Sequence, residues 1–145
     1  MGRLARDVLV ADHSSALLDR FFNNLGCLGI PGIKLYNENT QKESQGKFRT
    51  EEVGEMDLLL VAPNNDLIVV ELKKSSTDKT IGQVCRYMGW VKHRVANTGQ
   101  NVRGIIVTQD YDHRLAYAAN VIPNLTIKKV SISFNITSGE LELPQ

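Results

Sequence analysis

The stretch GEMDLLLVAPNNDLIVVELKKS, residues 54–75, decides the fold. It contains two apolar runs, LLLV and LIVV, separated by a segment of turn-forming residues. Continuous apolar runs bounded by turn signals indicate β-strands that are buried on both faces. Charged residues nevertheless stand at their ends: Asp57 precedes the first run, and Glu71 and Lys73 follow the second. Charges at the ends of strands that otherwise exclude charge point to function.

The register of these two strands decides whether the charged residues meet. Glu71 and Lys73 are two residues apart, so their side chains leave the same face of a strand. A loop made of the four residues PNND would place Asp57 opposite Leu72, on the wrong face. A loop of odd length, or a bulge beside Gly54, would bring Asp57 opposite Glu71. We therefore predict one of these two irregularities.

In that register, two carboxylates are within reach of one hard cation. Carboxylates, a backbone carbonyl and water are the ligands that suit Mg²⁺ or Mn²⁺. The metal ligands would be Asp57, Glu71 and the backbone carbonyl of Leu72. Such a metal can activate a water and stabilise charge on a phosphate, and Lys73 would orient or help to deprotonate that water. The alternative is that these are surface charges at strand ends, with a Glu–Lys pair.

More polar residues follow on the next predicted helix, at about residues 79–97. Gln83, Arg86, Tyr87 and Trp90 share one stripe of that helix, beside an apolar stripe that suits the sheet. Gln83 would hold the attacking water or a phosphate, Arg86 a phosphate, and Tyr87 a sugar or phosphate oxygen. The alternative is that both aromatic residues belong to the core, which we favour for Trp90.

Length and composition fit one α/β domain. The chain has 145 residues, 42% of them hydrophobic, and a net charge of +1, which neither indicates nor excludes a nucleic-acid binder. Cys27 and Cys85 fit no zinc spacing and indicate buried thiols in a reducing compartment, with a disulfide as the alternative. No segment approaches the ~20 apolar residues that span a bilayer. We expect a cytoplasmic protein without a membrane partner.

The expected elements are a helix, a group of strands, and then helix, strand, helix and strand. Strands that are covered on both faces require helices on each side of one mixed sheet. Asp110, Asp112 and His113 follow a predicted strand, and we expect them to cap a helix rather than to bind metal. The predicted single domain, 1–145, comprises a helical segment at about 4–25 and a catalytic core at about 33–136. The core begins with a strand at 33–36, an exposed loop at 37–47 and an extended segment at 48–53. It ends with a strand at 102–109, a helix at 111–122 and a final strand or strand pair at 125–136.

Asp57, the triplet Glu71-Leu72-Lys73 and Gln83 together resemble the motif of the PD-(D/E)XK nuclease superfamily. The finer resemblance is to the catalytic domain of the NucS (EndoMS) endonucleases. It covers about residues 47–134 and rests on FRTEEVGEMDLLL, IVVELKK, IGQVCRYMGWVKH and RGIIVTQDYDHRLAYAANVIPNLTIKKVSI.

The resemblance implies a restriction-endonuclease-like α-β-β-β-α-β core, with a central mixed sheet flanked by helices. It also implies metal-dependent cleavage of DNA phosphodiester bonds. By position, Asp57 and Glu71 would bind metal, Lys73 would serve the water, and Gln83 would be the fourth motif residue.

Two features depart from the family. Many members use an acid from the first helix, where this chain offers Asp12 or Asp19, and Glu55 is an alternative ligand two residues before Asp57. NucS enzymes also carry a separate N-terminal domain for dimerisation and DNA binding, for which this sequence has no room. The resemblance therefore leaves three alternatives: a stand-alone nuclease, a catalytic fragment, or a subunit whose recognition domain lies on a partner. A homodimer would double the DNA contacts.

These observations together predict a Mg²⁺- or Mn²⁺-dependent DNA endonuclease. The alternatives are an inactive nucleic-acid-binding module of the same fold, or an exonuclease or junction resolvase that uses the same site. Lys42 and Lys47 would form a clamp on the polar loop. The DNA contacts that we expect are Arg49, Lys47, Lys74, Arg86 and Tyr87.

Overall fold

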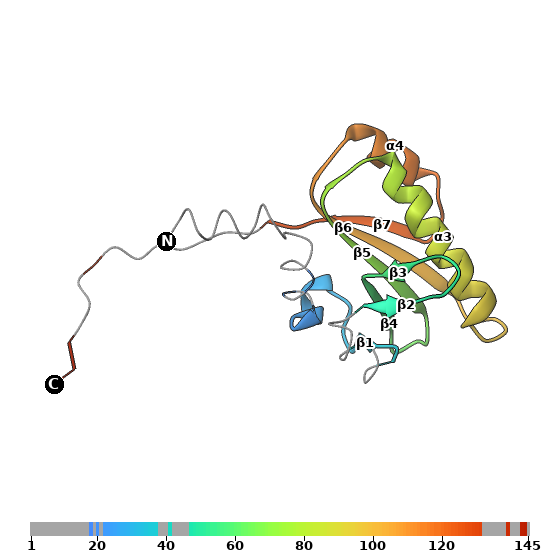
Figure 1. The fold of residues 1–145 in the computed structure, drawn as a ribbon, viewed down its shortest axis with the longest axis horizontal. Helices are drawn as coiled ribbons and strands as arrows, with labels where there is room; N and C mark the ends of the chain where they lie inside the picture. Colours follow the sequence, from blue (N-terminus) through green and yellow to red (C-terminus); the bar gives the residue numbers. More distant parts are fainter. Residues whose placement is uncertain are drawn as a thin grey trace.

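The computed structural model describes residues 18, 20, 22–37, 41, 47–131, 139 and 143–144. Figure 1 shows the arrangement of the elements within these ranges. In chain order they are η1 (Leu25–Leu28), β1 (Lys34–Leu35), β2 (Phe48–Arg49), β3 (Glu55–Met56), β4 (Leu58–Val61), β5 (Leu67–Ser76), α3 (Asp78–Arg94), β6 (Val102–Tyr111), α4 (His113–Asn120) and β7 (Leu125–Lys129).

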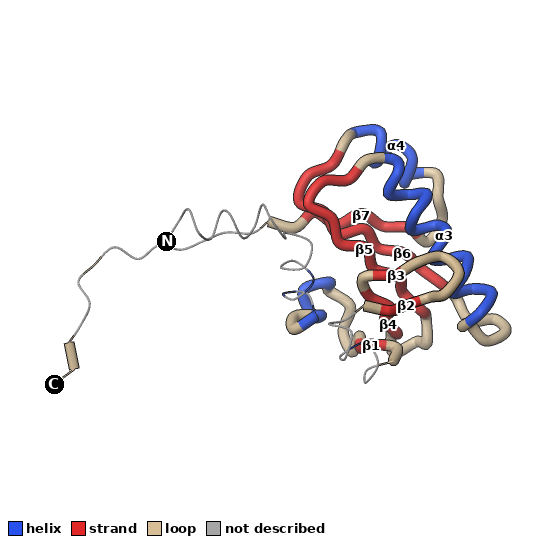
Figure 2. Tube along the Cα trace, in the orientation of Figure 1, coloured by secondary structure: helices blue, strands red, loops and turns tan. Residues whose placement is uncertain are grey.

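Five strands form one mixed sheet in the order β1-β4-β5-β6-β7. β4 is antiparallel to β1 and β5, whereas β5, β6 and β7 are mutually parallel. Parallel neighbours need crossover connections, which α3 and α4 provide. β2 and β3 form a separate antiparallel hairpin (Figure 2). The predicted α/β fold with a mixed sheet is confirmed.

Each face of the sheet has its own hydrophobic core. On one face, side chains of β5 such as Val69 pack with Val84 of α3 and Leu115 of α4. On the other face, Val70 and its neighbours pack with Leu18 and Leu28 of the N-terminal segment. The prediction of cover on both faces is confirmed, but α3 and α4 lie on the same face. The order of parallel strands explains this, because both crossovers run in the same direction across the sheet.

The register between β4 and β5 is the one that a site shared by Asp57 and Glu71 requires. Val61 pairs with Leu67 and Leu58 pairs with Val70, so the loop consists of residues 62–66 and has odd length. One residue further along, Asp57 therefore lies opposite Glu71. The predicted irregularity is confirmed as an odd loop.

Several predicted boundaries differ from the structure. β5 continues through the charged residues to Ser76, α3 begins at Asp78 after the N-cap Thr77, and α4 begins only after the N-cap Asp112. The predicted capping role of Asp112 is confirmed, because its side chain accepts the Arg114 N–H at 2.8 Å.

The predicted extended segment at 48–53 is a turn after its first two residues. Thr50 and Gly54 close that turn, because the Thr50 N–H donates to the Gly54 carbonyl at 3.0 Å. Gly54 adopts a φ of 99°, a conformation that glycine tolerates best. Most of the predicted helix at 4–25 and the last part of the predicted strand at 125–136 lie outside the described residues. Within the described ranges, no helix is long and apolar enough to cross a membrane.

Candidate active site

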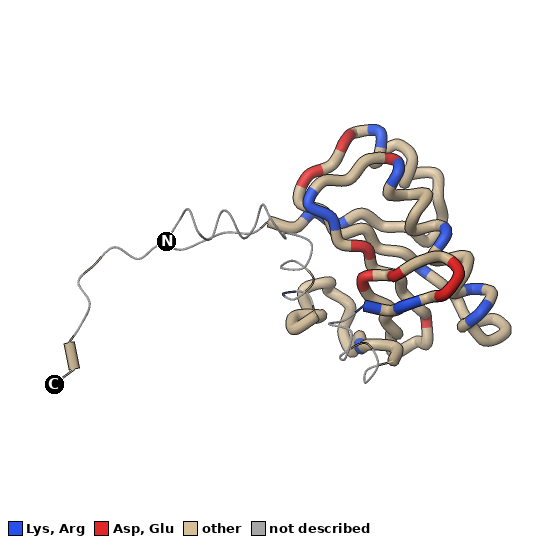
Figure 3. The backbone as a smooth tube through the Cα atoms, in the orientation of Figure 1, with Lys and Arg blue, Asp and Glu red and all other residues tan. Residues whose placement is uncertain are grey.

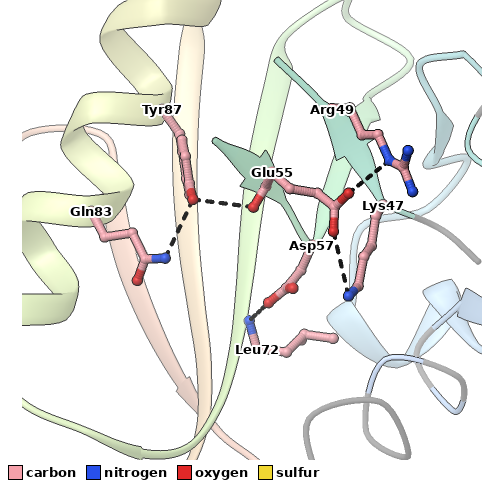
Figure 4. Close-up of polar contacts among 7 residues, drawn as sticks. All are labelled: Lys47, Arg49, Glu55, Asp57, Leu72, Gln83 and Tyr87. Atoms are coloured by element: carbon pink, nitrogen blue, oxygen red, sulfur yellow. Dashed lines mark hydrogen bonds and ion pairs between the residues drawn. The ribbon is translucent and has the colours of Figure 1, made fainter. Parts of the chain in front are cut away.

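Asp57 lies at the bend where the chain leaves the small hairpin and enters the sheet. Its Oδ2 accepts a hydrogen bond from the backbone N–H of Leu72 at 2.8 Å (Figure 4). β4 begins only at Leu58, so the carboxylate takes the place of a strand partner for this N–H. The bond thereby fixes the Asp57 carboxylate beside β5, at the position of Glu71.

Glu71 is a buried acid with little to compensate its charge. Only 3% of the residue is exposed, and its Oε2 has no hydrogen-bond partner among the described residues. Its Oε1 lies 3.7 Å from Lys73 Nζ, which is the charge that opposes the effect of burial. The pKa of Glu71 is raised to about 8. Burial is the largest cause, and the negative charge of Asp57 is the second. The acid is therefore poised to bind either a proton or a cation near neutral pH.

The donor set at this position fits a hard divalent cation. An unpartnered carboxylate oxygen beside a second carboxylate is the environment that a cation would stabilise. The N–H and C=O of one strand residue point to the same side, so the Leu72 carbonyl faces Asp57 as its N–H does. The described residues contain no group of three or more His, Cys, Asp or Glu that could hold a metal. The arrangement thus offers two carboxylates and one carbonyl, while Asp12 and Asp19 lie outside the described residues.

Gln83 and Tyr87 connect α3 to β3, which ends one residue before Asp57. Gln83 Nε2 donates to the Tyr87 hydroxyl at 3.3 Å, and this hydroxyl donates to the Glu55 backbone carbonyl at 3.1 Å (Figure 4). Tyr87 is only 3% exposed, because its ring packs in the core beneath α3. The prediction that Tyr87 contacts DNA is therefore wrong, and its hydroxyl instead holds the backbone two residues before Asp57.

Trp90 lies one helical turn further along α3. Its ring meets that of Phe48 edge-on, with the two centroids 6.2 Å apart. It also packs against the core on this face of the sheet. The core position that the sequence favoured for Trp90 is confirmed.

Glu55 points to cations rather than to the Asp57–Glu71 pair. Its Oε2 lies 2.8 Å from Arg49 Nε and its Oε1 3.4 Å from Lys47 Nζ (Figure 4). These contacts come from the pairing of β2 with β3, in which Arg49 lies opposite Glu55. The alternative in which Glu55 binds the metal is therefore corrected, since its carboxylate is directed at two positive charges.

The other expected DNA contacts lie on the surface. Figure 3 shows basic and acidic positions side by side along the β2–β3 hairpin. Lys74 is exposed at the end of β5, and Arg86 is exposed on α3, with its guanidinium carbon 5.6 Å from the centre of the Tyr87 ring. Their role in DNA binding stays a prediction, and Lys42 lies outside the described residues.

One residue near the site had no signal in the sequence. Gln41 falls in the segment predicted to be an exposed loop, yet it is fully buried. Its side-chain amide donates to the Leu59 carbonyl at 2.9 Å and accepts the Leu59 N–H at 3.0 Å. The side chain acts as a strand partner for β4, two residues after Asp57. Only the tertiary structure reveals this, because glutamine is common in exposed loops.

No protein-family model and no curated protein sequence matches the chain. Solved structures do match in fold. An EndoMS–dsDNA complex superposes with a TM-score of 0.62 at 20% identity, covering 84% of this chain and 46% of that one. EndoMS in its apo form superposes with a TM-score of 0.60 at 17% identity, and the match covers 83% of this chain and 47% of that one. The chain shares the restriction-endonuclease-like α/β fold of these EndoMS structures.

A third structure, a repair endonuclease from Pyrococcus abyssi, gives a TM-score of 0.48 at 24% identity, covering 64% of this chain and 42% of that one. The chain therefore spans less than half the length of the two EndoMS structures.

Proposed function

We propose that this chain is a Mg²⁺- or Mn²⁺-dependent deoxyribonuclease that acts as an endonuclease. The observation that carries the proposal is the Asp57–Glu71 pair, in which one buried carboxylate has an unpartnered oxygen and a pKa raised to about 8. Strongly perturbed acids beside a specific charge partner are typical of catalytic sites. The fold shared with EndoMS, one structure of which is a complex with dsDNA, supports DNA as the substrate.

The residues of the chain have separate tasks in this proposal. Asp57, Glu71 and the Leu72 carbonyl would hold the metal, which when bound supplies an activated water and stabilises charge on the phosphate. The Leu72 N–H orients the Asp57 carboxylate at 2.8 Å. Lys73, held near Glu71, donates hydrogen bonds to the attacking water or to a phosphate oxygen. Gln83, one turn from Tyr87, holds the same water or the phosphate.

Basic side chains around this site would bind the DNA backbone. We propose Lys47, Arg49, Lys74 and Arg86 for this task, all of them on elements that adjoin the site. The logarithm of the binding constant falls linearly with the logarithm of the salt concentration, and we call the gradient the salt slope. Each phosphate that these residues neutralise should make the salt slope steeper by about 0.9. Because the chain spans less than half of the EndoMS chains, the proposal includes a second copy or a separate recognition subunit as a partner.

Cleavage of a labelled DNA panel tests the proposal. The panel contains single strands, duplexes, mismatched duplexes and branched forms, each with Mg²⁺, Mn²⁺ or EDTA. Wild type should cut at least one form only with metal, and Glu71→Ala and Lys73→Ala should abolish this activity. Glu51→Ala, an exposed acid in the hairpin turn, is the control and should cut like wild type. Cutting that survives Glu71→Ala would reject the site.

A binding module that has lost turnover is the second candidate. The observation in its favour is that the described residues supply no third acidic side chain to the Asp57–Glu71 pair. A binder would shift DNA in a gel and leave it whole with either metal. Comparison of circular with linear substrates separates an endonuclease from an exonuclease, and four-way junctions in the panel identify a resolvase.

A further inference from the structure

Glu55 contacts two cations in the way that a phosphodiester group would. One of its oxygens lies 2.8 Å from Arg49 Nε and the other 3.4 Å from Lys47 Nζ. Lys47 and Arg49 are two residues apart in extended chain, so both side chains leave the same face. Two anionic oxygens on one centre, each facing its own cation, also describe a phosphodiester bound by arginine and lysine.

These contacts are accessible enough to be exchanged. The side chain of Arg49 is 76% exposed, and those of Lys47 and Glu55 are each 36% exposed. Ion pairs this open to solvent contribute little to stability. A nucleic-acid backbone could therefore replace the Glu55 carboxylate at a small cost.

The backbone of Glu55 is held independently of its side chain. Its carbonyl accepts the Tyr87 hydroxyl at 3.1 Å, and Glu55 and Met56 pair with Arg49 and Phe48 of β2. The carboxylate can consequently leave the two cations by rotation about its own side-chain bonds. Asp57, which follows on the same chain segment, would keep its place on the Leu72 N–H.

Lys47 and Arg49 contact the chain segment that leads into Asp57. Glu55 precedes Asp57 by two residues, a chain distance of about 7 Å at the rise of an extended strand. Phosphates of one DNA strand advance by about 3.4 Å along the helix axis per nucleotide. A DNA strand that follows this segment would bring one phosphate to Lys47 and Arg49 and a nearby phosphate to the Asp57–Glu71 pair.

We propose that Lys47 and Arg49 form a phosphodiester-binding pair, and that Glu55 is a built-in competitor that occupies this pair until a nucleic-acid backbone displaces it. The proposal rests on the proposed function and names one of its phosphate contacts and the control of that contact. In wild type, the displaced Glu55 carboxylate takes up salt cations again, which offsets part of the release of counterions from the DNA. Removal of the Glu55 charge should therefore strengthen binding and steepen its salt dependence.

The test is the affinity for a labelled duplex in EDTA, measured by fluorescence anisotropy between about 50 and 200 mM salt. The variant is Glu55→Gln. The matched control is Glu52→Gln, which removes the same charge from the same hairpin, where Glu52 contacts Arg94 at 2.9 Å. Glu55→Gln should bind about three- to tenfold tighter than the control, with a salt slope steeper by about one to two. The double variant with Arg49→Gln should lose this gain.

Three results would overturn the inference: equal affinity and slope for Glu55→Gln and Glu52→Gln, no measurable DNA binding by Glu55→Gln, or a gain that persists without Arg49. These outcomes are independent of the cleavage test. If wild type cuts DNA with metal and Glu55→Gln binds like the control, only the competitor role fails. If wild type cuts nothing, the nuclease proposal fails, whatever the affinities are.

Discussion

The Leu72 N–H donates to Asp57 Oδ2 at 2.8 Å, and this bond joins the bend before β4 to the strand that carries Glu71. The sheet ladder between β4 and β5 stops at the pair Leu58–Val70. Asp57 continues that ladder with its side chain. A single carboxylate therefore serves both to complete the sheet and to supply negative charge beside Glu71, and substitutions can separate the two roles.

Asp57→Asn should keep the structural role and lose the charge. The amide oxygen can accept the same Leu72 N–H, so the free energy of unfolding should stay close to that of wild type. Asp57→Ala removes the acceptor and should lower the free energy of unfolding by about 1–2 kcal/mol. Both should reduce metal-dependent cleavage by at least about a hundredfold. Urea unfolding of the two variants checks this, and equal destabilisation by both would contradict it.

The raised pKa of Glu71 should make stability depend on pH. The folded protein keeps a proton on Glu71 up to a pKa of about 8, whereas the unfolded chain loses it near the ordinary value of 4.5. The unfolded state therefore binds fewer protons in this window, and the free energy of unfolding falls as the pH rises from about 4.5 to 8, at most by roughly 1.4 kcal/mol per unit of pH.

Glu71→Gln removes this titration. In EDTA it should stabilise the protein relative to wild type by little near pH 5 and by a few kcal/mol near pH 8 or 9. Urea unfolding of both proteins over this range is the measurement. A stability difference that does not change with pH would show that Glu71 ionises normally.

Divalent metal should counteract this loss of stability. A cation can bind Glu71 only after the carboxyl group loses its proton, so metal affinity should rise with pH up to about 8 and binding should release protons. The thermal midpoint of wild type should increase with Mn²⁺ at pH 8, more than at pH 6. Glu71→Gln, the control, should show almost no increase. Equal shifts in both proteins would place the metal elsewhere.

Tyr87 should position the site without touching the substrate. Tyr87→Phe removes the hydroxyl that bonds the Glu55 carbonyl, at a cost of about 1 kcal/mol in stability. Cleavage should fall because Asp57 follows directly after this anchored segment, while the KM for DNA should change little. Tyr117→Phe on α4, whose side chain is largely exposed, is the control and should alter neither quantity. A large rise in KM for Tyr87→Phe would indicate direct contact with DNA.

The strand pair and its charges could be predicted because burial leaves a clear pattern. Charged residues beside continuous apolar runs are conspicuous, and the period of two along a strand fixes which loop lengths allow Asp57 to face Glu71. That argument predicted an odd loop or a bulge beside Gly54, and the structure has the odd loop. The same holds for the capping of α4 by Asp112, since an aspartate before a helix has few other local uses.

The surroundings of the pair could not be predicted, because they depend on tertiary contacts. Tyr87 shares a helical stripe with Gln83, but the angle of α3 over the sheet decides that its ring is buried. The partners of Glu55 follow from the turn at 50–54, which folds Arg49 back onto it. An extended strand through that segment, as the sequence suggested, would have left Glu55 free to face a metal.

Gln41 offers a test of how much the edge of β4 depends on a single side chain. Its amide group replaces a strand partner for Leu59 and is fully buried. Gln41→Met has a similar shape but lacks both hydrogen-bonding groups, so it should lower the free energy of unfolding by about 1–3 kcal/mol. The Leu59 N–H loses its partner, whereas the Leu59 carbonyl keeps the Tyr36 N–H at 3.0 Å. Hydrogen exchange at the Leu59 N–H should become much faster, whereas the Val69 N–H in the centre of the sheet should keep the protection that global stability allows.

Unchanged exchange at Leu59 would mean that another group covers this edge in solution. Because Asp57 precedes Leu59 by two residues, accelerated exchange together with weaker cleavage would show that the Gln41 contact also steadies the acid at the bend.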